Sequence, residues 1–394
     1  MMRPRLGIVA THPIHNQVPL YQYLAARTSV EPVVLFLSGY GLTESFDPGF
    51  GRWVKFDIPL TGGYEHKVVR NCSVKPDILT RWGLVNPVLP EVIKSSKLDV
   101  ILVNGWSSLS HWLAYITAVF CGIPYMLRGE SHPNGKSAPN GESVSIYKRA
   151  ARRALIRPLV RHADACLAIG KLNRDFYISC GAEPHRIIDA PYSVDTERFT
   201  RAGERGRARR ILLLESVDLA PELPLVLFAA RLQPRKAPLD LVRAMDLMDR
   251  PANLVVIGDG PLRADMERLA AARPWMRVLG FVNQTAIGGW YGAADLFVLP
   301  SRYEPWGLVV NEAMAAGAVP IVSDAVGCGP DLVAGNGWIY PAGDVAALAR
   351  TIALACEPEA LNKRRALARQ HSARYGIAET AHGIETAVKM ILGQ

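Results

Sequence analysis

The stretch Pro300-Ser-Arg-Tyr-Glu-Pro-Trp-Gly-Leu-Val-Val-Asn-Glu-Ala-Met-Ala-Ala-Gly317 follows a short apolar run, Leu296 to Leu299, that predicts a strand. Residues 307–316 predict a helix that ends at Gly317, in the usual C′ position. The free backbone N–H groups at the start of such a helix point to one spot, where the positive end of the helix dipole also lies. This unit therefore predicts an anion site, most naturally for a phosphate, on the N–H groups of Gly307, Leu308 and Val309.

Two carboxylates bracket this anion site. Glu304 lies in the loop before the helix, and Glu312 lies about 1.5 turns into it. Negative side chains repel a phosphate, so we expect them to accept hydrogen bonds from hydroxyl groups instead. A phosphate pair with hydroxyls on both sides describes a nucleoside diphosphate sugar, with the ribose on one side and the transferred sugar on the other.

The run Glu304-x7-Glu312, with Gly307-Leu-Val between the two acids, resembles the donor motif of the retaining GT-B glycosyltransferases of family four, also called glycosyl transferases group 1. The resemblance implies that Glu304 meets the donor sugar, Glu312 the ribose and the intervening amides the diphosphate. The alternative is an ordinary amphipathic helix with two solvated carboxylates, because two Glu at this spacing are common. The surrounding residues 300–327 favour the first interpretation.

Length and composition set the frame for this interpretation. The chain has 394 residues, 49% of them hydrophobic, which suits two domains with cores of their own. Its six cysteines are scattered, with no zinc spacing, and are expected to be reduced thiols of a cytoplasmic protein. The apolar run Leu6 to Ala10 is too short for a signal peptide, and the region 98–126 is broken by polar residues. A net charge of +9 is compatible with nucleic acid, anionic lipid or a nucleotide donor.

Both halves of the chain alternate short apolar runs with segments of helical spacing, which predicts two α/β domains with parallel sheets. The predicted fold class is GT-B, in which two facing Rossmann-like domains leave a cleft between them. Residues 1–200 are predicted to bind the acceptor and 201–374 the nucleotide sugar, with the basic run 201–210 as the connection. Residues 360–392 are predicted to be helical throughout, and the resemblance implies that the last helix, about 375–394, crosses back to the first domain. Residues 40–85 receive no assignment.

The strands are expected at 6–10, 33–37, 100–103, 124–127 and 165–168 in the first half, and at 225–229, 253–257, 277–279, 296–299 and 319–322 in the second. Helices are expected near 17–27, 107–121 and 144–161, then near 236–248, 261–271, 284–293, 307–316 and 344–356.

Arg231 and Lys236 follow the strand 225–229 and can clamp a diphosphate, one by its planar fork and the other as a point charge. ARLQPRK resembles the family motif in which this pair neutralises the leaving group. Phe281 and Val282 resemble the place where the base of the nucleotide rests. No Asp-x-Asp pair occurs where a strand meets a loop, so we expect no metal and no other cofactor.

Two loops of the first domain are expected to face the cleft. In Pro124-Tyr-Met-Leu-Arg-Gly-Glu-Ser-His-Pro133, Glu130 occupies the position where relatives place a catalytic His, and His132 follows two residues later. We predict that Glu130 stabilises charge at the anomeric carbon or orients the acceptor, and that His132 moves a proton; a structural role is the alternative. After the first strand, where relatives have a Gly-rich loop, this chain has a predicted acceptor-binding loop with His12, His15, Asn16 and Gln17.

The helix predicted over 144–161 carries six cations interleaved with apolar residues, a pattern typical of a helix on an anionic membrane surface. A solvated face of a packed helix is the alternative. A peripheral position on the inner face of the membrane would follow from the first interpretation.

The sequence as a whole predicts a retaining, metal-independent glycosyltransferase acting on a glycan or lipid-linked acceptor in bacterial polysaccharide or glycolipid synthesis. A GT-B epimerase acting on nucleotide sugars is the alternative. A basic nucleic-acid-binding protein is a further one, although no nucleic-acid motif is recognised.

Overall fold

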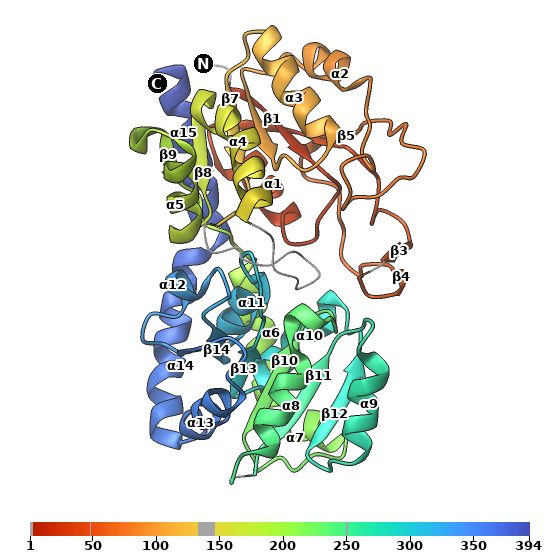
Figure 1. Ribbon diagram of the computed structural model, residues 1–394, viewed down its shortest axis with the longest axis vertical. Coiled ribbons are helices and arrows are strands. Elements are labelled where there is room, and N and C mark those ends of the chain that lie inside the picture. The colour runs from red at the N-terminus through yellow and green to blue at the C-terminus, as the bar shows by residue number, and fades with distance from the viewer. Residues whose placement is uncertain (1–2, 48, 133–145, 250) are drawn as a thin grey trace.

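Two α/β bodies make up the computed structural model, which describes residues 3–47, 49–132, 146–249 and 251–394 (Figure 1). The first contains a seven-stranded sheet in the order β5-β2-β1-β6-β7-β8-β9, in which every pair of neighbours is parallel. Its strands are β1 (Arg5–Ala10), β2 (Glu31–Phe36), β5 (Glu65–Val68), β6 (Val100–Asn104), β7 (Tyr125–Arg128), β8 (Ala165–Ala168) and β9 (Ile187–Asp189). Its helices are α1 (Val18–Arg27), α2 (Leu89–Ser95), α3 (Leu109–Phe120), α4 (Ile146–His162) and α5 (Lys171–Cys180).

The second body contains a six-stranded parallel sheet in the order β12-β11-β10-β13-β14-β15. Its strands are β10 (Leu225–Ala229), β11 (Asn253–Ile257), β12 (Met276–Gly280), β13 (Leu296–Leu299), β14 (Val319–Ser323) and β15 (Trp338–Tyr340). Its helices are α8 (Pro238–Asp246), α9 (Arg263–Ala271), α10 (Gln284–Ala293), α11 (Leu308–Ala316), α12 (Gly329–Leu332), α13 (Val345–Ala355) and α14 (Pro358–Ser372). Short 3₁₀ turns occupy Pro184–Arg186, Pro234–Lys236 and Ala373–Tyr375.

These two parallel sheets confirm the predicted fold class. The central strands are largely apolar because each sheet is buried on both faces, and each face packs into its own hydrophobic cluster. Residues 40–85, which received no assignment, contribute β5 and a small antiparallel hairpin made of β3 (Ser45–Asp47) and β4 (Arg52–Val54). Of the predicted helix 144–161, residues 144–145 lie outside the described residues. Across the part of the chain that the structure describes, no helix has the length and apolar character that crossing a bilayer requires.

The predicted connection 201–210 is wrong: it is helix α6 (Thr196–Ala208), followed by α7 (Arg210–Glu215). Asp195 begins α6 by accepting a hydrogen bond from the N–H of Arg198 at 2.9 Å. α6 packs on α10 and α11 with Gly203 and Gly206 against their backbones. Of the basic residues of the stretch, Arg201, Arg205 and Arg209 are exposed, whereas Arg207 and Arg210 pair with an acid of the second sheet. The chain therefore passes from the first body to the second before Thr196.

The predicted continuous helix 360–392 is also interrupted. α14 ends at Ser372, and α15 (Ile377–Leu392) begins after the extended Gly376. The interruption lies where the chain returns to the first body, and there Gly376 pairs with Val194 of the outgoing crossing. α15 packs against α1, β8 and β9, which confirms the expected crossing helix (Figure 1).

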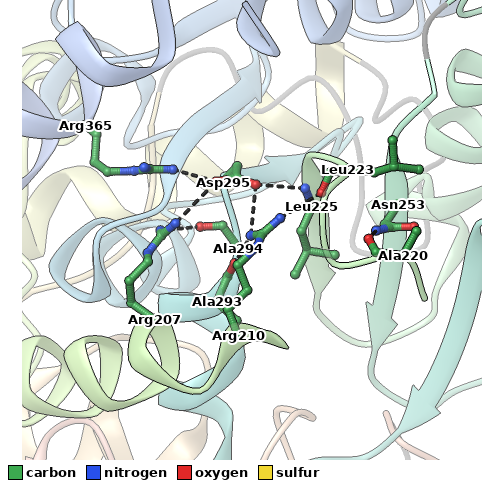
Figure 2. A network of polar contacts seen from close by, with 10 residues as sticks. All are labelled: Arg207, Arg210, Ala220, Leu223, Leu225, Asn253, Ala293, Ala294, Asp295 and Arg365. Atoms are coloured by element: carbon green, nitrogen blue, oxygen red, sulfur yellow. Dashed lines mark hydrogen bonds and ion pairs between the residues drawn. The ribbon is translucent and has the colours of Figure 1, made fainter. Parts of the chain in front are cut away.

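A buried ion cluster holds helices α6, α7 and α14 to the second sheet (Figure 2). Asp295, at the start of β13, pairs with Arg207 of α6 at 3.3 Å, Arg210 of α7 at 2.9 Å and Arg365 of α14 at 2.7 Å. Its other contact is the N–H of Leu225 at 2.9 Å. Burial raises the pKa of Asp295, but the three guanidinium groups and this N–H outweigh burial and hold the pKa below its usual range. The cluster lies at the amino ends of β10 and β13, opposite the edge where the site lies.

Candidate active site

The loop between β13 and α11 is fixed by a second loop, residues 325–328, that runs beside it. Glu304 donates its backbone N–H to the oxygen of Ala325 at 3.1 Å and accepts from the N–H of Gly327 at 2.9 Å. Gly307 adopts a φ of +102°, in the left-handed region that glycine tolerates, and forms the N-cap of α11. The N–H groups at the start of α11 thus have a rigid frame, as an anion site requires.

Arg231 and Lys236 lie beside this loop because β10 and β13 are neighbours in the sheet. The carboxyl ends of adjacent parallel strands open at one edge, so the residues that follow them meet there. The ammonium group of the buried Lys236 forms an ion pair with the carboxylate of Glu304. Burial, together with the charges of Arg235 and Arg231, lowers the pKa of Lys236 below its usual range. The predicted sugar-binding acid and one predicted diphosphate cation are therefore direct partners.

Glu312 lies on the buried face of α11. Its carboxylate accepts a hydrogen bond from the hydroxyl of Tyr291 at 3.0 Å. Burial raises the pKa of Glu312 to about 7, against the smaller opposing effects of the Tyr291 hydroxyl and Arg198. This carboxylate already accepts from one hydroxyl, the kind of donor that a ribose also offers.

His132 of the first body lies against Tyr303 of the second, and Glu130 is linked to Trp306 through Tyr192. The hydroxyl of Tyr192 donates to Glu130 at 2.6 Å, and the Tyr192 ring meets the edge of Trp306 at 6.1 Å between centroids. The His132 ring lies 5.7 Å from that of Tyr303. Both ring nitrogens of His132 are buried and find no partner within the part of the chain that the structure describes. Burial lowers the pKa of His132, so its imidazole is neutral at pH 7 and able to take up a proton.

The predicted acceptor loop forms the turn between β1 and α1. His12 bonds through Nδ1 to the hydroxyl of Thr11 at 2.9 Å, and the ring of His15 lies 4.8 Å from that of Phe56. Burial lowers the pKa of each imidazole to about 4, so both are neutral at pH 7. Gln17 is partly committed to the fold, because its side chain accepts from the hydroxyl of Tyr21 at 2.6 Å. Asn16 is half-buried in the same turn.

Phe281 and Val282 follow β12 at the same edge of the second sheet. Val282 packs against the core, whereas Phe281 meets Phe50 of the first body edge-on, 5.2 Å between ring centroids. The position predicted for the base is therefore lined from both bodies.

Comparisons with known proteins agree with this arrangement. Residues 213–373 match the family model described as Glycosyl transferases group 1. The chain is 34% identical over 312 residues to the D-inositol 3-phosphate glycosyltransferase 1 of Catenulispora acidiphila, a match that covers 71% of this chain and 69% of the relative. The chain belongs to the group 1 glycosyltransferases.

A second relative of this chain is D-inositol 3-phosphate glycosyltransferase 2 of the same organism, 35% identical over 219 residues. That match covers 51% of this chain and spans only half, 50%, of the relative's length. Among solved structures, Anabaena HepE in complex with UDP and glucose superposes with a TM-score of 0.70 at 16% identity, covering 98% of this chain and 99% of that one. This likeness establishes the fold.

Sequence reasoning missed three residues that contact the candidate site residues. Tyr192 and Tyr291 donate to Glu130 and Glu312, and Asp47 forms an ion pair with Arg231 at 2.8 Å. Tyr192 lies three residues after β9, a strand that the sequence analysis did not predict. Asp47 gave no signal, because its partner lies 184 positions further along the chain.

Proposed function

We propose that this protein is a retaining, metal-independent glycosyltransferase that moves a sugar from a nucleoside diphosphate sugar to a glycan or lipid-linked acceptor. One observation carries the proposal: Lys236 and Glu304 are paired at the loop that leads to the N-terminus of α11. A cation, a helix N-terminus and a carboxylate at one strand edge suit a diphosphate joined to a sugar. The UDP and glucose of the HepE complex are the same class of ligand.

In this proposal the second body, residues 201–374 in the sequence division, binds the donor. Glu304 accepts from hydroxyls of the sugar and Glu312 from the ribose. Arg231, Lys236 and the N–H groups of Gly307, Leu308 and Val309 stabilise the charge that develops as the bond from the anomeric carbon to the phosphate oxygen breaks. These groups replace the metal ion that a diphosphate leaving group otherwise needs. Phe281 and Val282 support the base.

The first body, which ends before Thr196, binds the acceptor together with the crossing helix α15 in the same proposal. Its loop with His12, His15, Asn16 and Gln17 holds the acceptor, whose hydroxyl oxygen forms the new bond to the anomeric carbon. The proton of that hydroxyl passes either to the departing phosphate or to a side chain. The imidazole of His132, which has no hydrogen-bond partner among the described residues, is our candidate for that side chain. Glu130, oriented by Tyr192, stabilises positive charge at the anomeric carbon.

We further propose that the acceptor is reached at an anionic membrane surface, as for a peripheral enzyme on the inner leaflet. α3 ends in the exposed apolar residues Phe120 and Val119, with 87% and 65% of their surfaces accessible. A groove of about 560 Å³ separates this end of α3 from the end of α4, where Arg157 and Arg161 are exposed. Apolar groups beside cations suit a bilayer that carries acidic headgroups.

Vesicle co-sedimentation tests the membrane proposal. We expect binding to phosphatidylglycerol-containing vesicles and little to pure phosphatidylcholine. Arg157→Glu/Arg161→Glu is expected to weaken binding by at least about 30-fold, since two basic residues near the surface contribute about 2 kcal/mol together. Arg268→Glu, on the exposed face of α9, is the matched control. Equal binding of both variants and the wild type would contradict this surface.

The transfer activity itself is tested in two steps. A thermal-shift screen of UDP-, GDP- and ADP-sugars identifies the donor, and nucleotide release is then followed with and without candidate glycan and lipid acceptors. We expect one donor to raise the melting temperature and its turnover to depend on the acceptor. Donor turnover without any acceptor would favour a nucleotide-sugar epimerase, and no response to any nucleotide sugar would remove the proposal.

A further inference from the structure

The β3–β4 hairpin reaches from the first body onto the proposed donor site (Figure 1). Asp47 pairs with Arg231 at 2.8 Å, and Arg52 lies 3.6 Å from the carboxylate of Asp259. Just beyond the hairpin, the side-chain amide of Asn283 donates to the backbone oxygen of Lys55 at 2.8 Å. The contacts run along the loops that follow β10, β11 and β12, the edge where a nucleotide is proposed to bind.

The carboxylate of Asp47 serves two purposes at once. Oδ1 accepts from the backbone N–H groups of Gly49 at 2.7 Å and Phe50 at 3.0 Å, which fixes the turn. Oδ2 accepts from Nη2 of Arg231. The side chain of Asp47 is only 9% exposed, so this pair is shielded from water on the Asp47 side, whereas Arg231 keeps 34% of its side chain accessible. The accessible part of the guanidinium leaves a path for a competing anion.

The backbone and ring of the turn enclose the rest of the guanidinium. A Cβ on Gly49 would lie 2.7 Å from the guanidinium carbon of Arg231, so the backbone of the turn is packed directly against this group. The Phe50 ring lies 4.9 Å from the same carbon, a cation–π contact, and touches Phe281 on its other side. Arg231 is thus held by an acid, a backbone and an aromatic ring of the first body.

A donor diphosphate and Asp47 need the same cation. Arg231 presents one planar fork, and a carboxylate next to a bound diphosphate is repelled by it. We propose that Asp47 is a competing counter-ion that sets the affinity of the site for nucleoside diphosphates: it leaves Arg231 when a diphosphate binds and returns when the nucleoside diphosphate product departs. This inference rests on the proposed function and adds product release to it.

The competition predicts that removing the charge of Asp47 strengthens nucleotide binding. Asp47→Asn keeps Oδ1 for the turn and removes the ion pair. By isothermal titration with whichever of UDP, GDP or ADP binds, we expect the Kd to fall by about 5- to 10-fold and, by stopped flow, the nucleotide to dissociate more slowly. In the Arg231→Gln background the same substitution is expected to change the Kd by less than about twofold, because the shared cation is gone.

Asp57→Asn is the control for general charge removal, since Asp57 lies in the same segment but bonds to Thr285 rather than to a phosphate-binding group. Its Kd is expected to stay within about twofold of the wild type. An unchanged or weaker Kd for Asp47→Asn, or an equal gain in the Arg231→Gln background or in Asp57→Asn, would overturn the competition while leaving the transfer function standing. Binding of no nucleotide by the wild type or by Asp47→Asn would instead remove the proposed function and the competition with it.

Discussion

At the scale of single residues, the site consists of charges that are buried and paired before any substrate arrives. Lys236 is buried against Glu304, and Glu312 is buried against Tyr291. A buried charge is costly unless a partner compensates it, so each of these groups depends on its neighbour. The same burial strengthens every contact that a substrate makes there, because water does not screen it. The residues proposed to bind the diphosphate are therefore also those proposed to stabilise it as the leaving group.

Glu312 gives a prediction on pH. Its folded pKa of about 7 lies above that of an unfolded Glu, so the native state binds the extra proton between these values. The stability from this proton is complete below about pH 4.5 and is lost as the pH rises through 7. Urea unfolding at pH 5 and pH 7 is expected to show a loss of about 2 kcal/mol in the wild type that Glu312→Gln lacks. The same pH dependence in both proteins would assign the effect elsewhere.

The site residues that could be predicted from the sequence are those that directly follow neighbouring strands of one sheet. Glu304, Arg231 and Lys236 follow strands that lie side by side, so a local pattern was enough to place them together. The pairs Asp47–Arg231 and Tyr192–Glu130 could not be predicted, because each depends on how distant segments pack. Whether His12, His15, Asn16 and Gln17 bind an acceptor stays a prediction.

At the scale of elements, apolar periodicity identified the buried strands. It did not identify α6 or the break between α14 and α15. The strands 225–229, 253–257 and 296–299 agree with β10, β11 and β13 to the residue, because both faces of the sheet are covered. α6 was missed because, apart from Phe199, its buried positions are the glycines Gly203 and Gly206, which pack against α11 and α10. The break at Gly376 was missed because the helical pattern resumes at once in α15.

The Asp295 cluster carries the stability prediction at this scale. Asp295→Ala leaves Arg210, Arg207 and Arg365 around a buried gap without their carboxylate, which is expected to destabilise the protein by about 3–5 kcal/mol. Asp246→Ala removes the partner of the more exposed pair with Arg273 and is expected to cost less than about 1 kcal/mol. The midpoints of urea unfolding of the two variants measure this difference. Equal midpoints would contradict a stabilising role for the cluster.

At the scale of the whole molecule, the two bodies are joined on one side and touch on the other (Figure 1). Both chain crossings run together, with Val194 beside Gly376 and the hydroxyl of Thr380 2.7 Å from that of Ser193. The β3–β4 hairpin makes its contacts at the opposite side of the cleft. Glu130 and His132 belong to the first body and Glu304 to the second, so any change in the angle between the bodies alters the distance between the proposed donor and acceptor groups.

The central claim is that a diphosphate sugar lies between Glu304 and Glu312. The most direct test is kcat/KM for nucleotide release with the donor found in the screen, measured for Glu304→Gln and Glu312→Gln. Glu267→Gln, on the exposed face of α9, is the control, and the melting temperature of each variant checks the fold. Since charged hydrogen bonds contribute up to about 3 kcal/mol, we predict a loss of about 100-fold for Glu304→Gln, a clear loss for Glu312→Gln and none for the control. Wild-type turnover by both site variants would contradict the account.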